Sequence, residues 1–416
     1  MTSPIEDPQM LDARPTPLGP TSPELPAWAD PTLFTASPQA TEWGIFHAGK
    51  LAPMPLAEIV ARVEAGPGVA QWHGGGERAE VVLVTRPESA RPLAAVECPE
   101  LQAAILRRDQ QALSKARRKN GIVFYPLLAF TVLLDLGLHT FAILPAIFAM
   151  STGAAHVEAW LTLNKLKSDP DKYLRGIAAQ LRYAAWLTVS GVKHWCRTCA
   201  MLIIWLVIGC VEWFLPGPPG VGGEPGYIIS AALVKSAIAA EPWRLLTATM
   251  LHGSIIHYIM NASAMFSLGL LLERGANRYL LTPVWLAGAL AGSLLSWAGT
   301  STTSVGASGG ILAVFAFLLV MGQRRQSRLP PDFGSSLVRS LVMIAMLGLL
   351  AWGAIDNAAH LGGAIAGATI GYFVFRSDDG TLPLRDTSVL AAIGRIGDSL
   401  FVVAALFTMA KLLRII

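Results

Sequence analysis

Gly306-Ala307-Ser308-Gly309 and Ala359-His360-Leu361-Gly362-Gly363-Ala364-Ile365-Ala366-Gly367 are the two stretches of this chain that decide its fold. Each stands at the start of an almost wholly apolar run, 309–322 in the first case and 361–375 in the second. A hydroxyl or an imidazole inside a membrane helix is costly, so such residues are candidates for function. Ser308 and His360 also make up the minimal pair of a nucleophile and its base.

The composition indicates a membrane protein. Of the 416 residues, 53% are hydrophobic and 14% are charged, whereas soluble proteins carry about 25% charged residues. The net charge of +4 is small and scattered, which argues against a nucleic-acid partner and leaves the lipid bilayer as the surroundings. The Cys196 and Cys199 pair stands alone without a second CxxC, so we expect neither a metal nor a cofactor.

The N-terminal part is predicted to be soluble. Residues 1–40 are rich in proline and acidic side chains, as disordered tails are. Residues 41–120 combine short β-like runs with a helical pattern at 56–63 and end in a basic amphipathic helix over 101–120. The stretch 43–50 resembles the opening of GYF-type modules. We expect a small cytosolic domain here, whose partner the sequence leaves open.

Residues 121–154 are apolar but interrupted, and their flanks predict how they meet the membrane. Basic residues both precede and follow the segment, and Lys and Arg collect in cytoplasmic loops. The segment is therefore expected to enter the membrane and return as a hairpin, followed by a cytosolic amphipathic linker over 155–194. The flanking residues are Arg107, Arg108, Lys115, Arg117, Arg118 and Lys119 before it, and Lys165, Lys167, Lys172, Arg175 and Arg182 after it.

Seven further segments reach spanning length in the sequence. Basic residues follow the second, fourth and sixth of them, so the first should start in the cytoplasm, and Ser308 and His360 should both enter from the outer side. The expected fold class is an all-α polytopic membrane protein with six core helices over 195–376, and a linker and seventh helix over 377–416. The segments are 198–214, 247–272, 280–297, 305–322, 337–352, 358–375 and 391–413.

The second segment carries a further polar pair. His257 and Asn261 stand four residues apart and so share one helix face, whereas His252, five before His257, should face elsewhere. With the helix entering near residue 247, His257 would lie roughly 15 Å inside. Two inward donors at that depth suit an oxyanion that develops in a dry site.

Glycine spacing predicts close helix packing. Gly363, Gly367 and Gly371 repeat every four residues, and Gly309 and Gly310 offer a matching thin surface. Close approach is what Ser308 and His360 require, because they come from different helices. The alternative is that the glycines only pack helices and the polar residues only hold them together.

These motifs, in this order and spacing, strongly resemble the rhomboid family of intramembrane serine proteases over about residues 195–376. The resemblance implies that Ser308 is the nucleophile, that His360 is the general base, and that His257, Asn261 and the Ser308 backbone N–H form the oxyanion hole. Further matching positions are His252, Trp243 and Arg244 in the loop before the second helix, Glu273 and Arg274 at its end, and Gly306, Gly309, Gly363 and Gly367.

Two positions need separate interpretation. The family commonly has an aromatic residue four after the nucleophile, where this chain has Leu312. Packing alone would then orient His360, which implies low activity. Asp356, four before His360, could be a triad acid, but an N-cap at the start of a helix is the favoured role.

The resemblance implies a serine endopeptidase that cleaves single-span membrane proteins near the outer face, after a small residue. The alternative is a catalytically weak or silent relative that binds transmembrane helices as an adaptor. A transporter using the histidines is disfavoured because no carboxylate cluster or repeat of helices accompanies them, and no HExxH motif supports a metalloprotease. The charge pattern favours an integral protein of a bacterial inner membrane with a cytoplasmic N-terminus.

Overall fold

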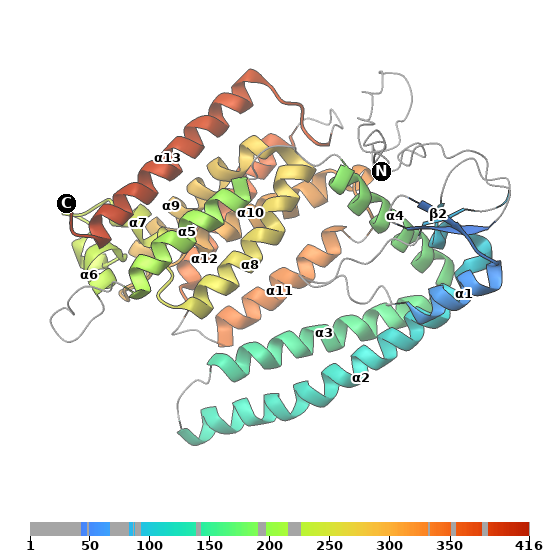
Figure 1. Ribbon diagram of the computed structural model, residues 1–416. Coiled ribbons are helices and arrows are strands. Elements are labelled where there is room, and N and C mark those ends of the chain that lie inside the picture. Colours follow the sequence, from blue (N-terminus) through green and yellow to red (C-terminus); the bar gives the residue numbers. More distant parts are fainter. Residues whose placement is uncertain are drawn as a thin grey trace, which may run out of the picture. The chain divides into compact units, whose positions relative to one another are not determined.

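The computed structural model describes residues 43–47, 50–66, 83–85, 87, 93–138, 143–189, 197–214, 226–331, 333–350, 355–376 and 382–415 (Figure 1). The chain divides into two compact units. The first comprises residues 1–190, 329–332 and 341–351, and the second comprises 191–328, 333–340 and 352–416. The predicted tail over 1–40 and Cys196 lie outside the described residues.

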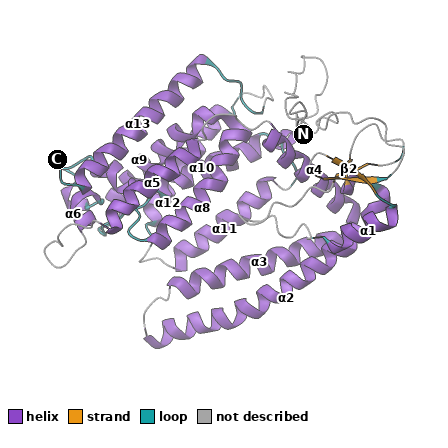
Figure 2. Ribbon diagram, viewed as in Figure 1, coloured by secondary structure: helices purple, strands orange, loops and turns teal. Residues whose placement is uncertain are grey.

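The first unit opens with a small antiparallel sheet (Figure 2). Its strands are β1 (Gly44–His47), β2 (Lys50–Pro53), β3 (Leu83–Thr85) and β4 (Leu93–Ala94), in the order β2-β1-β3-β4. Ile45 pairs with Ala52 on one side and Val84 on the other. Because Ile45 and Val84 are both buried, this central pair anchors the sheet on the core.

Helices complete the core of this unit. Helix α1 (Leu56–Ala65) buries Ile59 and Val63, which stand four residues apart and so share one face, as the helical pattern at 56–63 predicted. A short 3-10 turn, η4 (Ala95–Glu97), leads into α2 (Pro99–Leu138), and α4 (Pro170–Val189) packs on the same core. Tyr173 donates to the fully buried Asp109 over 3.0 Å, and burial beside that carboxylate raises the tyrosine pKa.

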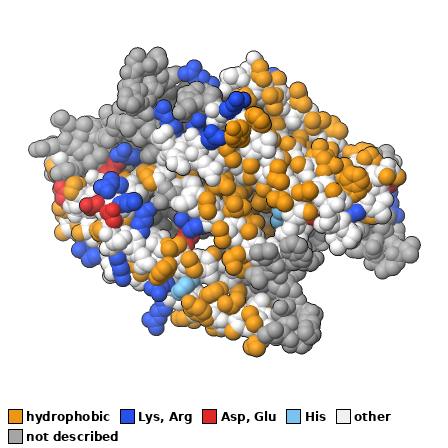
Figure 3. Space-filling model, turned by 180° about the vertical axis from the view of Figure 1, so that it is seen from behind, with side chains coloured by type: hydrophobic (Ala, Val, Ile, Leu, Met, Phe, Trp, Pro, Cys, Tyr) orange, Lys and Arg blue, Asp and Glu red, His pale blue; other side chains and the backbone are white. Residues whose placement is uncertain are grey.

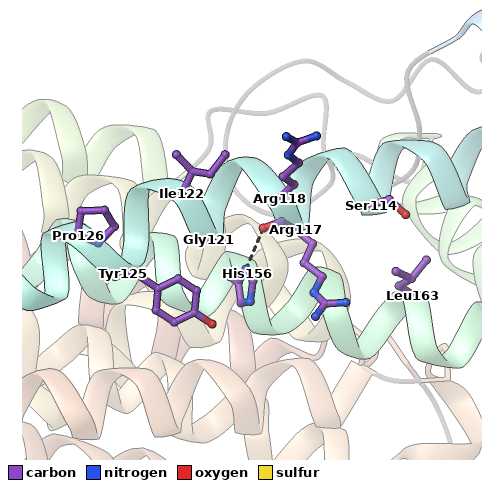
Figure 4. A pocket seen from close by; sticks show the side chains of 9 residues that line it. All are labelled: Ser114, Arg117, Arg118, Gly121, Ile122, Tyr125, Pro126, His156 and Leu163. Atoms are coloured by element: carbon purple, nitrogen blue, oxygen red, sulfur yellow. Dashed lines mark hydrogen bonds between the residues drawn. The ribbon is translucent and has the colours of Figure 1, made fainter.

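Helices α2 and α3 (Ile143–Ser168) lie side by side and run antiparallel. The amphipathic helix and the first hairpin arm, predicted as separate elements, form the single helix α2, and α3 continues well past residue 154. Between them lies an open groove of about 650 Å³, lined by basic, aromatic and apolar side chains (Figure 4). His156 Nδ1 on α3 donates to the Arg117 carbonyl on α2 over 2.8 Å, which ties the helices together at this groove.

The second unit is helical. Its long helices overlap the spanning segments predicted from the sequence. They are α5 (Arg197–Phe214), α8 (Ile255–Leu272), α9 (Leu281–Gly299), α10 (Ser308–Arg324), α12 (Asn357–Val374) and α13 (Ser388–Leu412). The residues of α11 (Phe333–Leu350) are divided between the two units. Shorter turns join them: α6 (Gly226–Ala231), η5 (Lys235–Ala237), α7 (Arg244–Thr247), η6 (Ala248–Met250), η7 (Glu273–Asn277), η8 (Arg278–Leu280) and η9 (Gln326–Arg328).

Hydrophobic side chains cover much of the surface of this helical unit (Figure 3). Large apolar residues are exposed along α5, α8, α12 and α13, for example Val207, Ile259, Ile365 and Val403. Among the described residues, three helical runs are long and apolar enough to cross a bilayer: Arg197–Phe214, Ile255–Gly299 and Ser388–Leu412. Ser308–Arg324 and Phe333–Met346 are shorter apolar helices. This surface is that of a protein embedded in lipid.

The predicted segment over 247–272 is not one helix. Residues 244–250 form the short turns α7 and η6, and α8 begins only at Ile255. Gly253 has a left-handed φ of +65°, and Ser254 caps α8 by accepting from the His257 N–H over 3.2 Å. The expectation that the helix enters near residue 247 and places His257 roughly 15 Å inside was wrong, because α8 begins at Ile255 and His257 is in its first turn.

Helix α13 is fixed to the rest of the unit by polar and aromatic contacts. Asp398 pairs with Arg197 on α5 at 2.9 Å and accepts from Thr282 on α9 over 2.7 Å. Phe401 packs edge-on against Trp285 with ring centroids 5.4 Å apart. A charge placed mid-helix is therefore paired, as membrane surroundings require.

Candidate functional site

Ser308 is the first residue of α10, so its backbone N–H belongs to the helix turn whose donors have no partner within the helix. Gly306 precedes it in the chain with a φ of +142°. A residue with a side chain could adopt this conformation only with strain. The Gly306 N–H donates to the Ala248 carbonyl over 2.9 Å, which fixes the turn before the serine.

His360 lies in the first turn of α12. Asp356 caps this helix by accepting from the Ala359 N–H over 2.9 Å, so the N-cap role predicted for Asp356 is confirmed. The His360 N–H donates to the Asp356 carbonyl over 3.1 Å. These hydrogen bonds fix the backbone of His360 at the start of α12.

Small residues bring α9, α10 and α12 into backbone contact. A Cβ on Gly363 would overlap the Gly309 carbonyl, and one on Gly367 would overlap the Ala313 carbonyl. A Cβ on Gly309 would lie 3.3 Å from the carbonyl oxygen of Ala359. Since Gly309 follows Ser308 and Ala359 precedes His360, this contact sets the separation of the two candidate catalytic residues.

His257 joins the same cluster. A Cβ built on Gly306 would lie 2.9 Å from His257 Cε1 and 3.8 Å from Ser308 Oγ. His257 Nδ1 lies 2.6 Å from the His252 carbonyl, which can only accept, so Nδ1 carries the hydrogen. In the neutral ring Nε2 is then an acceptor.

Asn261 follows one turn further along α8 and is buried. Its Nδ2 is buried without a hydrogen-bond partner among the described residues, which is costly for an amide donor. Leu312, one turn after Ser308 on α10, is also buried. Within the described ranges, no group of three His, Cys, Asp or Glu side chains gathers as a metal site requires.

His252 lies in the turn before α8, not on the helix, so the argument from helix rotation did not apply to it. Its ring is fully buried, 5.6 Å from the ring of Trp205 and 5.7 Å from that of His257. The carboxylate of Glu212 on α5 accepts from the backbone N–H groups of His252 and Gly253. Glu212 was not predicted as a site residue; its signal in the sequence was a single acid within an apolar helix.

Trp243 and Arg244 contact each other, with the Arg244 guanidinium carbon 4.7 Å from the centroid of the Trp243 ring. Arg244 is buried, pairs with Glu241, and donates to the Ala232 carbonyl over 2.8 Å. The indole of Trp243 also packs edge-on against Phe407 on α13, with ring centroids 5.7 Å apart. Residues 215–225 of the first loop lie outside the described residues.

Glu273 is buried where α8 ends. Its carboxylate accepts from the Thr198 N–H over 3.0 Å at the start of α5. Glu273 therefore joins the end of one helix to the start of another, and it lies at the opposite end of α8 from His257.

Fold and site together define a helical membrane protein in which small residues bring α9, α10 and α12 into contact next to Ser308 and His360. Residues 239–377 match the Rhomboid domain, so this part of the chain carries a rhomboid domain. The chain is 35% identical to Rhomboid protease GluP of Bacillus subtilis over 130 residues, which is 30% of this chain and 25% of that protein.

Two eukaryotic proteins are also similar. RHOMBOID-like protein 6, mitochondrial, of Arabidopsis thaliana is 33% identical over 186 residues, 41% of this chain and 58% of that protein. Rhomboid-related protein 2 of Mus musculus is 34% identical over 169 residues, 37% of this chain and 54% of that protein. The chain thus spans between a quarter and somewhat over half of the length of these relatives.

Proposed function

We propose that this chain is an intramembrane serine endopeptidase with Ser308 as nucleophile and His360 as general base. The observation that carries the proposal is the contact of α10 with α12 at Gly309 and Ala359, which holds the serine and histidine at neighbouring helix starts. The amide Nδ2 of Asn261, which is buried without a partner among the described residues, supports it, because such a donor suits a ligand oxygen.

In the proposed reaction, Ser308 Oγ attacks the carbonyl carbon of the scissile peptide bond while His360 accepts the hydroxyl proton. The tetrahedral intermediate carries its charge on the former carbonyl oxygen. His360 then passes the proton to the leaving amine, which leaves an acyl-serine. Water, deprotonated by the same histidine, attacks this ester, releases the acid product and restores Ser308.

The proposed oxyanion donors differ in whether they always carry a hydrogen. Asn261 Nδ2 and the Ser308 backbone N–H always carry hydrogens. His257 Nε2 can donate only when the ring is positively charged, because Nδ1 already donates its hydrogen to the His252 carbonyl. We therefore assign the main share of oxyanion stabilisation to Asn261 and the backbone, with His257 as the weaker donor.

We infer that the substrates are single-span membrane proteins cut near the outer face, after a small residue. A helical peptide bond buries its carbonyl in the helix, so the substrate must unwind locally before attack. The distribution of Lys and Arg supports a cytoplasmic N-terminus and, for a bacterial chain, the inner membrane. Reporters fused at residues 120 and 169 should both locate to the cytoplasm; opposite locations would exclude the hairpin.

The test is covalent labelling by a fluorophosphonate, which reacts only with an activated serine. The detergent-solubilised protein should be labelled and should cleave a tagged single-span substrate, and Ser308→Ala should lose both. Ser267→Ala, which alters an exposed hydroxyl on α8, is the matched control and should behave as wild type. His360→Ala should be as inactive as Ser308→Ala, because the two act as a unit.

The same experiment separates the alternative of a silent adaptor. A folded wild-type protein that binds single-span helices but takes no label and makes no cut would refute the protease and favour the adaptor. Retained cleavage by Ser308→Ala would refute the assigned nucleophile instead.

A further inference from the structure

A lysine is buried near the proposed active site and has no part in the mechanism above. Lys235 lies in η5, and only 8% of its side chain is exposed. Its Nζ donates to Ser296 Oγ on α9 over 2.6 Å and to Ser304 Oγ over 2.8 Å. Asp356 Oδ2 lies 3.9 Å from the same nitrogen. A buried ammonium with this set of partners is held in one place.

Asp356 connects this lysine to the start of α12. Its Oδ1 caps the helix at the Ala359 N–H, while its Oδ2 accepts a short hydrogen bond from Ser296 Oγ. Ser296 thus receives a hydrogen from Lys235 and passes its own to Asp356. The residue after Ala359 is His360, so the network ends at the helix turn that carries the proposed base.

Ser304 connects the lysine to the other half of the proposed dyad. It stands four residues before Ser308, and its backbone pairs with Leu233 in an isolated β-bridge, with N···O distances of 3.0 and 3.3 Å. Leu233 is two residues before Lys235, so backbone and side-chain contacts join the same two segments. The approach to Ser308 is therefore fixed to the segment that carries the lysine.

Burial is costly for the ammonium, and desolvation lowers the Lys235 pKa to about 8, while the nearby Asp356 acts in the opposite direction. Such a cost is tolerated where the charge is needed to hold other groups. Here the groups are two serines and a helix-capping carboxylate that come from three segments of the unit.

We propose that Lys235 is a positioning residue that joins Ser304 to Asp356 and so fixes the separation of Ser308 from His360. The inference rests on the proposed protease function, because it assigns a role in the geometry of that dyad. Lys235 does not touch the substrate in this account. It acts through the loop before the nucleophile and the cap before the base.

The test compares Lys235→Met, which keeps the length of the side chain and removes its charge, with Lys411→Met on α13 as the matched control. We expect the turnover number and the rate of fluorophosphonate labelling to fall about ten- to a hundredfold in Lys235→Met, since small displacements of reacting groups have effects of that size. KM should stay unchanged, and Lys411→Met should match wild type in all three.

A double-mutant cycle tests whether Lys235 acts through Asp356. Asp356→Asn keeps a capping side chain but loses the charge, so its effect should not add to that of Lys235→Met if both act through one network. Independent, additive losses would overturn the proposal, and so would wild-type labelling by Lys235→Met. If that variant does not fold, Ser304→Ala takes its place: a slower labelling rate with unchanged KM supports the proposal, and a wild-type rate refutes it.

The outcomes for function and for the lysine stay distinct. A wild-type protein that takes no label refutes the protease itself. A labelled wild type with a fully active Lys235→Met refutes only the positioning role.

Discussion

Adding one methyl group to α9 should slow the proposed reaction without touching any reacting group. A Cβ on Gly292 would lie 2.6 Å from the carbonyl oxygen of Ala359, and real Cβ atoms essentially never come closer than 3.0 Å to such an atom. Ala359 must therefore move by at least about 0.4 Å, because close-packed interiors do not absorb an overlap with backbone. Since His360 is the next residue, the base moves with it.

The expected magnitude follows from that displacement. A shift of about 1 Å in a catalytic group lowers the rate about a hundredfold, so about half of that shift should lower turnover by Gly292→Ala about tenfold. The matched control is Gly299→Ala on the same helix, where the added Cβ meets its nearest neighbour, Ala358 Cβ, at 3.8 Å. Both changes replace a helical glycine by alanine, which gains about 0.5–1 kcal/mol in mid-helix and less at the last residue of α9, and only Gly292→Ala adds the overlap with Ala359.

The assay is the rate of fluorophosphonate labelling at fixed probe concentration, with thermal unfolding measured in parallel. Gly292→Ala should label about tenfold more slowly, while Gly299→Ala should label at the wild-type rate and unfold at an equal or higher temperature. Equal labelling rates for Gly292→Ala and wild type would refute the argument that contact of α9 with Ala359 sets the position of His360.

Further outcomes follow from the same geometry. Asn261→Ala should lower the turnover number by about a hundredfold and His257→Ala by less, since only the asparagine donor always carries its hydrogen. A larger loss in His257→Ala than in Asn261→Ala, measured by cleavage, would refute the assignment of Asn261 as the stronger donor. Cleavage should decline as the pH rises through about 8, where Lys235 facing Asp356 loses its charge, and this decline should be absent from Lys235→Met. Over that range the unfolded chain binds more protons at this lysine than the folded one, so its titration raises stability with pH and cannot cause the decline by unfolding. Removing residues 1–190 should leave labelling intact, because every proposed catalytic residue lies in the second unit; loss of label from a truncated protein that remains folded in detergent would contradict this.

Much of the helical unit follows from apolar runs, because a membrane helix needs a long stretch without charge. The predicted segment 358–375 corresponds to α12 (Asn357–Val374), and 198–214 corresponds to α5 (Arg197–Phe214). The segment 247–272 failed because hydropathy does not register a break among apolar residues. The local signal was Gly253-Ser254, a glycine able to adopt positive φ followed by a capping serine.

The polar network around Lys235 could not be predicted from the sequence. Lys235 and Asp356 are more than a hundred residues apart, and local periodicity carries no information on which distant side chains meet. The sequence predicted that Asp356 would cap a helix, since Asp at a helix start is a local pattern. It did not predict that Ser296 would join that cap to a lysine, because this depends on how α9 lies against α12.

Three carboxylates of the second unit accept hydrogen bonds from backbone N–H groups, which explains why they are stable in apolar surroundings. Glu212, Glu273 and Asp356 each accept from backbone N–H groups at or next to the start of a helix, which helix geometry leaves without partners. Where water is scarce such donors must be satisfied within the protein. The buried indole N–H groups of Trp205 and Trp285 lie within an aromatic cluster, where the rings contribute apolar packing. The amide of Asn261 has no comparable apolar role, and its Nδ2 has no partner among the described residues, which is consistent with the oxyanion role that we propose for it.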